Sequence, residues 1–336
     1  MASFVTRPNG RGCGAAVMRR AKMCLAAAAL ASSSALAQVW PSGPVTVVLS
    51  NSAGSAPDIL LRLVTERLGR SLKQPFNVLN RVGGNGVAAM VAVTRAKPDG
   101  YTLSFASSTQ LAANVWLVKD LPYDPEKDLV PIAMVINSIP LVIAANPRLP
   151  ANTFPELIAL AKAQPGKLSY SAAGGLPPLF GEMLNKVAGI SIVGVTYKDT
   201  MQATVETISG LVDLTYQAIP GVEPSRQAGK LKYLAVTSRE RFPVLPDLPS
   251  VAETLPGFGM SGSFALLGPA GLPQDIAVRL NREVDAVMKD PEIVKRLYQF
   301  GFSSNGAGTF QALRAYIREE REFWARVAKE LNLQPQ

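Results

Sequence analysis

Short runs of serine, glycine and alanine are the parts of this chain best suited to chemistry, because they come directly after predicted strands. The first run, residues 50–58, joins a strand expected over 45–49 to a helix expected over 58–73. Small side chains let backbone N–H groups approach an anion, and a helix N-terminus adds about half a positive charge. The spacing of Ser55 and Asp58 also matches a capping box. A cap at Asp58 is compatible with a role in making a ligand-binding loop rigid.

Two further small-residue loops follow predicted strands. Residues 107–109 follow the strand expected over 102–106, and residues 171–175 follow the one expected over 168–171. In an open parallel sheet, ligands gather at the carboxyl ends of the strands. The three loops could therefore converge on one cleft, although an ordinary turn is the alternative interpretation of each loop taken singly.

Reaction centres find little support in the sequence. The chain has no histidine, which removes His-dependent triads, imidazole metal sites and the commonest general base near neutral pH. Residues 83–86 lack the spacing of a dinucleotide-binding loop, and residues 259–263 miss the nucleophile-elbow pattern at their last position. We therefore expect no catalytic residue, no metal site and no cofactor. Paired carboxylates lie in charged contexts and are expected to be solvated: Asp124 with Asp128, and Glu319 with Glu320.

The first 37 residues have the order of a secretory signal peptide. They contain five basic residues and no acidic one, then an apolar run over 23–31, and they end in Ala35-Leu36-Ala37. We expect cleavage before Gln38. The alternative is a transmembrane anchor, but the apolar run has about nine residues where a bilayer needs about 20. Met18 is an alternative start of the chain.

Removal of this leader changes the chemistry expected of the working protein. It takes away both cysteines, Cys13 and Cys24, so that no disulfide and no Cys/His metal site can form. It also lowers the net charge from +9 to +4, because 29 basic residues then face 25 acidic ones. No basic stripe with interleaved aromatic residues remains, so nucleic acid is not an expected partner.

Strand-like and helix-like runs alternate along the rest of the chain, which predicts an α/β fold with largely parallel sheets. After the strand at 45–49, further strands are expected over 76–79, 102–106, 132–135, 141–144, 168–171, 192–195, 214–216, 231–237 and 264–267. After the helix at 58–73, further helices are expected over 86–96, 153–164, 178–188, 200–209, 222–229, 273–289, 291–300 and 309–330.

This number of strands suits two lobes better than one sheet. The chain is expected to cross between the lobes near 131–144 and to return between 237 and 267. Lobe I then comprises 38–138 with 261–336, and lobe II comprises 139–260. The last helix is amphipathic and is expected to pack on the first lobe.

A series of short motifs also runs through the chain in a fixed order. They are Asn80-Arg81-x-Gly83-Gly84, Pro98-Asp99-Gly100-Tyr101-Thr102-Leu103, Leu121-Pro122-Tyr123-Asp124-Pro125-x-Lys127-Asp128, Pro165-Gly166-Lys167-Leu168-Ser169-Tyr170, Tyr197-Lys198, Ala228-Gly229-Lys230-Leu231, Leu245-Pro246-Asp247-x-Pro249-Ser250 and Pro269-Ala270-Gly271-x-Pro273. In this order they resemble the substrate-binding proteins of tripartite tricarboxylate transporters, also called the Bug family. The resemblance covers essentially all of residues 40–330.

The resemblance implies a two-lobed periplasmic binding protein of type II, with the Venus flytrap architecture. Such a receptor captures a small carboxylate between its lobes and delivers it to the membrane subunits of a tripartite transporter. Recognition in the family relies on backbone groups and ordered water, and lobe closure strengthens those contacts by removing solvent. A monomer in the periplasm is expected. The alternatives are a sensory or scaffold protein of the same fold with no transport role and, less favoured, an enzyme.

Several positions depart from the family's pattern. Ser55 and Ala56 stand where the first loop usually has glycines, and their β-carbons restrict φ and narrow the approach for a ligand. Gln217 stands where the family often has an acid, a loss that favours an anionic ligand. Tyr197 could instead be a core residue. The expected ligand-binding residues are Asn51, Ser52, Gly54, Ser55, Ala56, Asp58, Ser107, Ser108, Thr109, Ser171, Ala173, Gly174, Gly175, Tyr197 and Gln217.

Overall fold

The structure is a computed structural model that describes residues 1–3, 40–173 and 176–335. It divides into two compact units, Met1–Ser42 and Gly43–Gln336, and all of the helices and strands below belong to the second. Apart from residues 1–3, the predicted leader and its cleavage point lie outside the described residues. Within the described part, no helix combines the length and the apolar character that crossing a membrane requires.

Three parallel strands form one end of the sheet. β1 (Val45–Leu49) lies between β2 (Phe76–Asn80) and β3 (Thr102–Ser107). β1 is almost wholly buried because its β-branched and leucine side chains have helices against them. α2 (Ala56–Leu72) connects β1 to β2, and α3 (Val87–Thr94) lies between β2 and β3 in the chain. Leu61, Val64 and Leu68 recur at helical spacing on the buried side of α2, as the sequence predicts.

The long strand β4 (Leu129–Ala145) links this end of the sheet to the other. Its first part pairs with β9 (Ser261–Pro269), which in turn pairs with β3. Its last part pairs with β7 (Leu214–Ala218) and β8 (Lys232–Val236). The sequence predicts two separate strands here, 132–135 and 141–144, because polar residues and Pro140 interrupt the apolar run. The structure instead has one strand, with shifts of register toward β9 in its middle.

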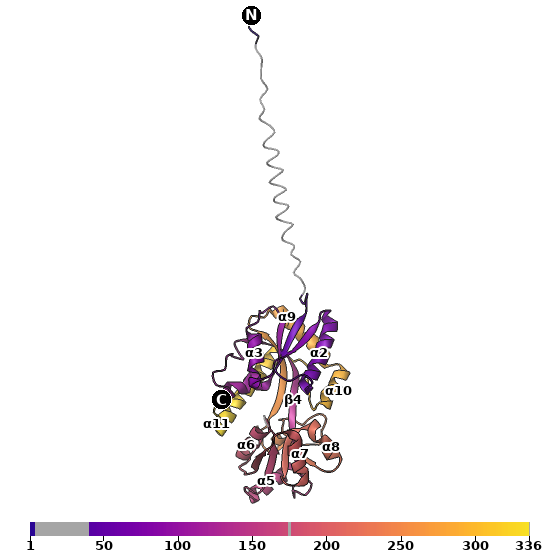
Figure 1. Ribbon diagram of the computed structural model, residues 1–336, viewed down its shortest axis with the longest axis vertical. Coiled ribbons are helices and arrows are strands. Elements are labelled where there is room, and N and C mark those ends of the chain that lie inside the picture. The colour runs from indigo at the N-terminus through magenta and orange to yellow at the C-terminus, as the bar shows by residue number, and fades with distance from the viewer. Residues whose placement is uncertain (4–39, 174–175, 336) are drawn as a thin grey trace. The chain divides into compact units, whose positions relative to one another are not determined.

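The other end of the sheet is built around a second parallel set. β5 (Ser169–Ala172) lies between β6 (Val193–Thr196) and β7, so that the complete order is β2-β1-β3-β9-β4-β7-β5-β6 with β8 beside β4. The helices that alternate with these strands are α5 (Phe154–Ala163), α6 (Leu176–Ala188), α7 (Thr200–Ser209) and α8 (Ile219–Gln227). Figure 1 shows β4 running from the region of α2, α3 and α9 toward these four helices. The predicted α/β class is confirmed, and every antiparallel pairing between the strands involves β4 or β9.

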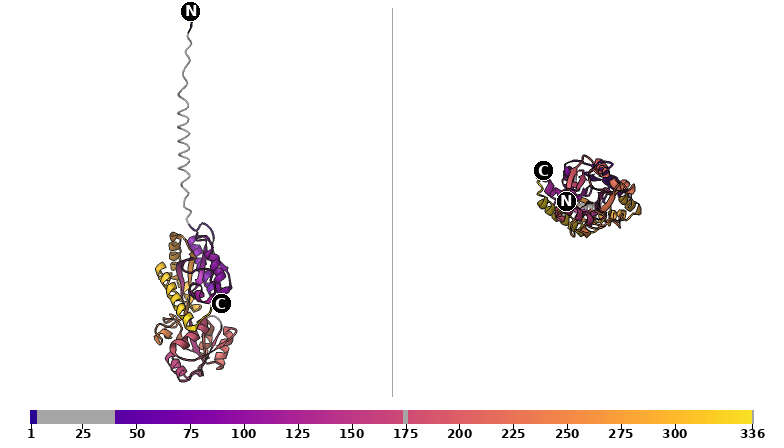
Figure 2. Two further views of the ribbon diagram at one scale, coloured as in Figure 1. Left: turned by 90° about the vertical axis from the view of Figure 1, so that its left-hand side faces the viewer. Right: turned by 90° about the horizontal axis from the view of Figure 1, so that it is seen from below.

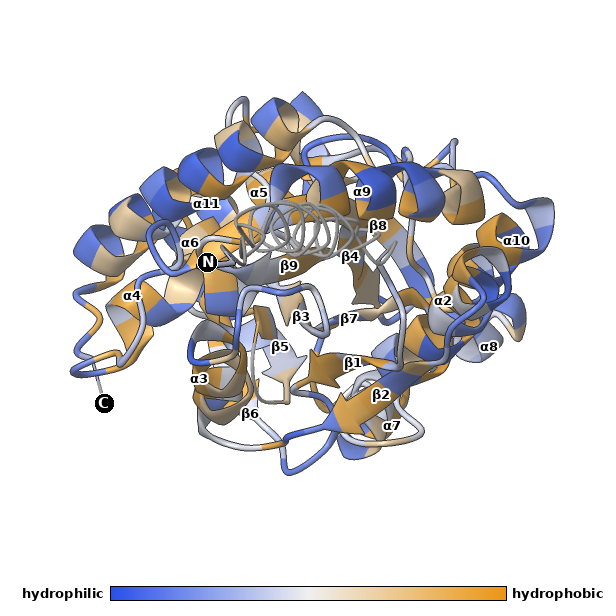
Figure 3. Cartoon of the chain, turned by 90° about the horizontal axis from the view of Figure 1, so that it is seen from above, coloured by the Kyte–Doolittle hydropathy of each residue, from blue (hydrophilic) through white to orange (hydrophobic). Residues whose placement is uncertain are grey.

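The C-terminal part of the chain folds as α9 (Gln274–Met288), α10 (Pro291–Gln299) and α11 (Phe310–Leu331). α9 and α11 alternate between hydrophilic and hydrophobic residues, whereas β1 and β2 are mainly hydrophobic (Figure 3). Leu313, near the start of α11, belongs to a buried cluster with residues of β1 and β3, but Trp324 belongs to a cluster with residues of β5 and β7. α11 therefore packs against the first strand set, as expected, and in addition against the second set, which the sequence did not predict. Its yellow ribbon can be followed along both regions in Figure 2.

One helical segment is absent from the sequence prediction. The π-helical turn η2 (Thr109–Ala113) continues into the short α4 (Asn114–Leu117). The segment lacks an amphipathic pattern because residues 110–114 are all buried, so its periodicity gives no helical signal. The 3₁₀ turns η1 (Gly84–Gly86) and η3 (Val251–Glu253) complete the regular structure.

Candidate functional site

The first two predicted loops leave the same edge of the sheet. β1 and β3 are parallel neighbours, with Leu49 opposite Phe105, so residues 50–55 and 107–109 begin side by side. β2 ends at this edge too, where the Arg81 N–H donates to the Leu49 carbonyl at 2.7 Å. The structure therefore brings together Asn51, Ser52, Gly54, Ser55, Ala56, Asp58, Ser107, Ser108 and Thr109, as the sequence predicts.

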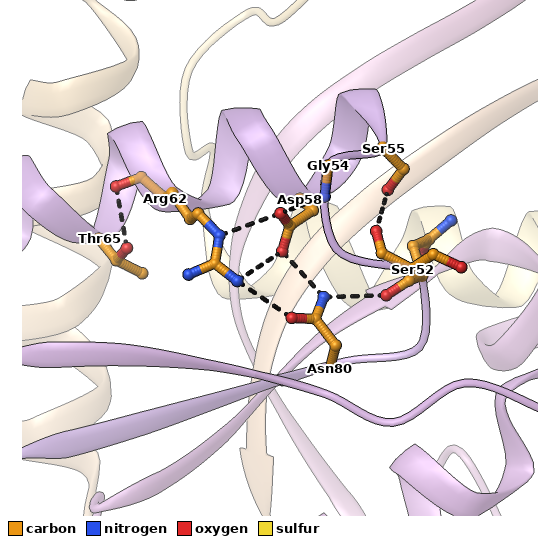
Figure 4. A network of polar contacts seen from close by, with 8 residues as sticks. Ser52, Gly54, Ser55, Asp58, Arg62, Thr65 and Asn80 are labelled. Atoms are coloured by element: carbon orange, nitrogen blue, oxygen red, sulfur yellow. Dashed lines mark hydrogen bonds and ion pairs between the residues drawn. The ribbon is translucent and has the colours of Figure 1, made fainter.

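Asp58 lies at the centre of a polar network beneath the first loop (Figure 4). Its side chain is only 2% exposed. The carboxylate accepts hydrogen bonds from the Gly54 N–H at 2.9 Å, from Arg62 Nε and Nη2 at 3.0 Å each, and from Asn80 Nδ2 at 2.8 Å. A carboxylate offers about four acceptor positions, so this set of donors occupies them all. Asp58 therefore holds the loop in place and has no position left to contact a ligand.

The predicted capping box is not formed. Ser55 occupies the N-cap position of α2, but its hydroxyl donates to the Ser52 carbonyl at 2.7 Å and caps no helical N–H. The Asp58 carboxylate reaches back to Gly54, one residue before the position that a capping box requires. The amino end of α2 consequently has no side-chain cap, and its N–H groups can serve an anion.

Arg62 and Asn80 complete the network and were missed by sequence reasoning. Arg62 Nη2 also donates to Asn80 Oδ1 at 3.0 Å, and Asn80 Nδ2 donates to the Asn51 carbonyl at 2.9 Å. Burial alone would raise the pKa of Asp58, but the hydrogen bonds from Arg62, Asn80 and Gly54 outweigh it and hold that pKa below its usual value. The i,i+4 spacing of Asp58 and Arg62 was the available signal. Asn80 gives no such signal, because only the register of β2 brings it close.

Gly54 is the point at which the first loop needs glycine. Its φ of 81° lies in the left-handed region, which side chains with a β-carbon disfavour. Ser52 and Gly54 are exposed, whereas Asn51, Ser55 and Ala56 are partly buried. The loop thus presents backbone to solvent while its ends are tied to the network of Asp58, Arg62 and Asn80.

Gln110 holds the second loop in a similar way. Its Oε1 accepts from the Ser107 N–H at 2.7 Å and from the Ser107 hydroxyl at 3.2 Å, and its Nε2 donates to the Gly86 carbonyl at 3.4 Å. Gln110 is 1% exposed, whereas Thr109 beside it is exposed. Sequence reasoning missed Gln110 because it lies in η2, which was not predicted.

The remaining predicted residues belong to the second parallel set of strands. Ala173 follows β5, Tyr197 follows β6 and Gln217 is the penultimate residue of β7, so these positions share one edge. The Tyr197 N–H donates to the Ala172 carbonyl at 2.9 Å. Partial burial, together with the nearby charge of Glu206, raises the pKa of Tyr197. Gly174 and Gly175 lie outside the described residues.

Ser171 points away from this edge. Its side chain is fully buried, and its hydroxyl lies 3.1 Å from the Ala203 carbonyl and 3.0 Å from Thr207 Oγ1 of α7. The preceding residue in the strand, Tyr170, faces the opposite side, as alternation along a strand requires. Ser171 therefore supports the packing of α7 on β5, and its hydroxyl is not available at the sheet edge.

Gln217 is also largely buried, at 4% exposure. Its Nε2 lies 3.1 Å from the Thr200 carbonyl, 2.8 Å from Thr204 Oγ1 and 3.1 Å from Thr215 Oγ1. These contacts fasten the first turn of α7 to β7. The side-chain amide nitrogen of Gln217 is therefore committed to the fold.

A separate cavity of about 240 Å³ lies beside the middle of β4 and contains none of the predicted ligand-binding residues. Asn137, Ser138, Arg239, Tyr316 and Glu320 are among the residues that line it. Glu320 was expected to be solvated, which is wrong: burial raises its pKa to about 7, although the charge of Arg239 opposes the shift. The error arose because its charged neighbours in α11 suggested a solvated face, whereas this turn of the helix faces β4 and the 238–243 segment.

Comparison with known proteins identifies relatives over nearly the whole chain. The model of the family described as "Tripartite tricarboxylate transporter family receptor" matches residues 60–333. A UPF0065 protein of Bordetella bronchiseptica is 36% identical over 307 residues, which cover 91% of each chain. The solved structure of R. palustris Rpa4515 with adipate is 30% identical, with a TM-score of 0.71, and covers 88% of this chain and 100% of that one. The periplasmic binding protein BugD is 29% identical, with a TM-score of 0.68 and the same coverage.

Proposed function

Because the chain belongs to the tripartite tricarboxylate transporter family of receptors, we propose that it captures a small carboxylate and delivers it to the membrane subunits of a transporter. Its relative Rpa4515 was solved with adipate, and its relative BugD is named as a periplasmic binding protein. These two relatives support both the class of ligand and a location in the periplasm. Export by the leader over residues 1–37 is part of the same proposal, as is a monomeric state.

The structure of the first loop is the main support for this proposal. The loop presents exposed backbone at Ser52 and Ala53, next to the N-terminus of α2 that no side chain caps. An ionised ligand group there would gain N–H donors and the favourable end of the helix dipole. The Asp58 network holds the loop before the ligand arrives, which lowers the entropy that binding would otherwise lose.

We further propose that the ligand lies between two lobes, 38–138 with 261–336 and 139–260. The two parallel strand sets, joined through β4, support this division, because each set gathers predicted residues at its own carboxyl edge. The ligand's carboxylate would lie at the first loop and at residues 107–109. Its other end would meet Ala173, Tyr197 and Gln217.

The receptor would act without chemical change to the ligand. Its family and its structural relatives are receptors for solutes and not enzymes. Asp58, the acid nearest to the proposed ligand, is committed to four donors and stays ionised. It would therefore be unsuited to proton transfer at the ligand.

A thermal-shift screen of the purified protein against small carboxylic acids tests the proposal. A ligand at one hundred times its Kd stabilises the folded state by about 2.7 kcal/mol, which raises the melting temperature by several degrees. We expect at least one acid to do so, with amines and neutral sugars of similar size as controls. A screen in which no acid raises the melting temperature would refute the proposed function.

A further inference from the structure

We infer that the ligand has a hydrogen-bond donor, such as a hydroxyl group, at the end opposite its carboxylate, and that Gln217 Oε1 accepts from this donor. The inference rests on the proposed function, because it concerns the far end of the same ligand. It narrows the ligand class from mono- or dicarboxylates to monocarboxylates with a distal donor.

The orientation of the Gln217 amide is fixed by its surroundings. A backbone carbonyl can only accept hydrogen bonds, so the group 3.1 Å from the Thr200 carbonyl must be the amide nitrogen. The hydroxyls of Thr204 and Thr215 lie within 3.1 Å of the same nitrogen. An amide nitrogen has only two hydrogens, and these acceptors consume both. Gln217 therefore has no N–H left to donate to a second carboxylate of the ligand.

The amide oxygen is in the opposite situation. No described residue donates a hydrogen bond to Gln217 Oε1. In the described part of the chain, some polar atoms are fully buried and have no hydrogen-bond partner, for example Tyr216 Oη and Asn114 Oδ1. Gln217 Oε1 is not among these fully buried atoms. A methyl group built on Gly221 would lie 3.5 Å from Oε1, so the oxygen faces the first turn of α8, where glycine leaves the space unfilled. Gln217 thus offers a preformed acceptor at the carboxyl end of β7.

The two edges of the proposed site consequently differ in polarity. The first loop offers N–H groups of the backbone and the N-terminus of α2, which suit an anion. The second edge offers Oε1 at the end of β7, an acceptor that has no proton to donate. A second carboxylate beside Oε1 would therefore face another acceptor. Two other groups at this edge would favour a dicarboxylate: Lys198, exposed in the loop before α7, and the start of α8, which no side chain caps. Tighter binding of the dicarboxylate would show that one of them contacts the ligand.

Matched sets of ligands test this directly on the unaltered protein. At each chain length from four to eight carbons, isothermal titration at pH 7.5 would compare the unsubstituted acid, the terminal hydroxy acid and the dicarboxylic acid. We expect the hydroxy acid to bind about tenfold more tightly than the unsubstituted acid, because one buried acceptor gains its partner. The dicarboxylate should bind more weakly than the hydroxy acid. It should gain affinity at pH 5, where one of its carboxyl groups begins to protonate and can donate.

The variant Gln217→Met attributes the preference to this side chain. It should bind the hydroxy acid and the unsubstituted acid equally, and the comparison on the unaltered protein decides the matter if the variant does not fold. A dicarboxylate that binds more tightly than its hydroxy acid at every length would overturn the inference and leave the proposed function intact. If none of these acids binds, the proposed function fails and the inference fails with it.

Discussion

Asp58 shows how a buried carboxylate can hold a proposed binding loop in place while keeping no acceptor position free for a ligand. Its donors come from the first loop, from α2 and from the end of β2, so one buried carboxylate fixes three segments relative to one another. Gln110 holds the second loop in the same way, and the amide nitrogen of Gln217 fastens the first turn of α7 to β7. At these positions polar side chains fix the shape of the proposed site, and in our proposal it is mainly the backbone that contacts the ligand.

The first prediction at this scale concerns Arg62. Replacing it in Arg62→Gln removes two donors from Asp58, so the first loop should become mobile and ligand affinity should fall about tenfold. Stability should fall by only about 1–2 kcal/mol, because half of the Arg62 side chain is exposed. Hydrogen exchange at the Gly54 amide measures the loop without any ligand and should accelerate. Arg70→Gln is the matched control, since Arg70 pairs with the exposed Glu66 on the same helix.

An unchanged exchange rate at Gly54 in Arg62→Gln would show that Asp58 does not depend on Arg62 to hold the loop. Faster exchange without loss of affinity would show instead that the loop does not bind the ligand.

A second prediction concerns the pH dependence of stability through Glu320. Its pKa in the folded protein is raised to about 7 from an ordinary value of 4.5, so the folded state holds a proton that the unfolded state has lost. This contribution to stability is fully present below pH 4.5 and is lost as the pH rises through 7. We expect the free energy of unfolding to fall by about 2–3 kcal/mol between pH 5 and pH 8 through this group alone.

Urea denaturation at the two pH values measures the effect. Glu320→Gln should flatten the dependence, whereas Glu319→Gln, at the exposed neighbouring position, should preserve it. Equal slopes for the original protein and for Glu320→Gln would contradict this assignment.

At the scale of elements, Tyr170 of β5 shows how α6 and β6 are fixed to the strand. The Tyr170 ring lies 4.8 Å from the Tyr216 ring, centroid to centroid, and occupies the space above two glycines. A β-carbon on Gly181 of α6 would lie 2.3 Å from Tyr170 Cζ, and one on Gly194 of β6 would lie 2.6 Å from its hydroxyl oxygen. The two glycines are therefore required by the neighbouring ring.

Gly181→Ala should destabilise the protein by about 1–3 kcal/mol, because Tyr170 or α6 must move. The loss should occur even though alanine favours a helix by about 1 kcal/mol over glycine. Gly43→Ala is the control, since nothing lies within 4 Å of a β-carbon there. Chemical denaturation of both variants gives the comparison, and equal stabilities would contradict the packing described.

The elements also show what the sequence could and could not predict. The sequence predicted α2 because its leucine and valine residues recur at helical spacing, and it predicted β1 because its residues are mostly β-branched. The sequence predicted two strands in place of β4, because Asn137, Ser138 and Pro140 interrupt its apolar residues. The structure has one continuous strand, which pairs with β9 on both sides of this interruption. In the candidate site, the predicted ends of β1 and β3 indicated correctly that the loops after these two strands lie side by side. They could not predict that Asn80 lies against Asp58, since 22 residues separate the two in the chain and only tertiary structure brings them together.

At the scale of the whole protein, β4 and α11 are the elements that connect the two strand sets. β4 pairs with β9 along its first part and with β7 along its last part, and α11 contributes to the buried clusters of both regions. Near the middle of β4, Ser138 and Ser261 join their hydroxyls at 2.7 Å beside the cavity that Glu320 lines. If the proposed lobes move relative to each other, we expect β4 to bend near its middle. The pairing with β9 is irregular there, so bending would break fewer regular hydrogen bonds.

The crystal structure of the protein with a carboxylate found by the ligand screen is the most direct test of the account. We predict one unmodified acid whose carboxylate accepts hydrogen bonds from the backbone N–H groups of Ser52, Ala53 or Ala56, because those of Gly54 and Ser55 are already donated within the loop. The far end of the acid should lie within hydrogen-bonding distance of Gln217 Oε1. An acid held elsewhere, or one recovered chemically changed, would contradict the account.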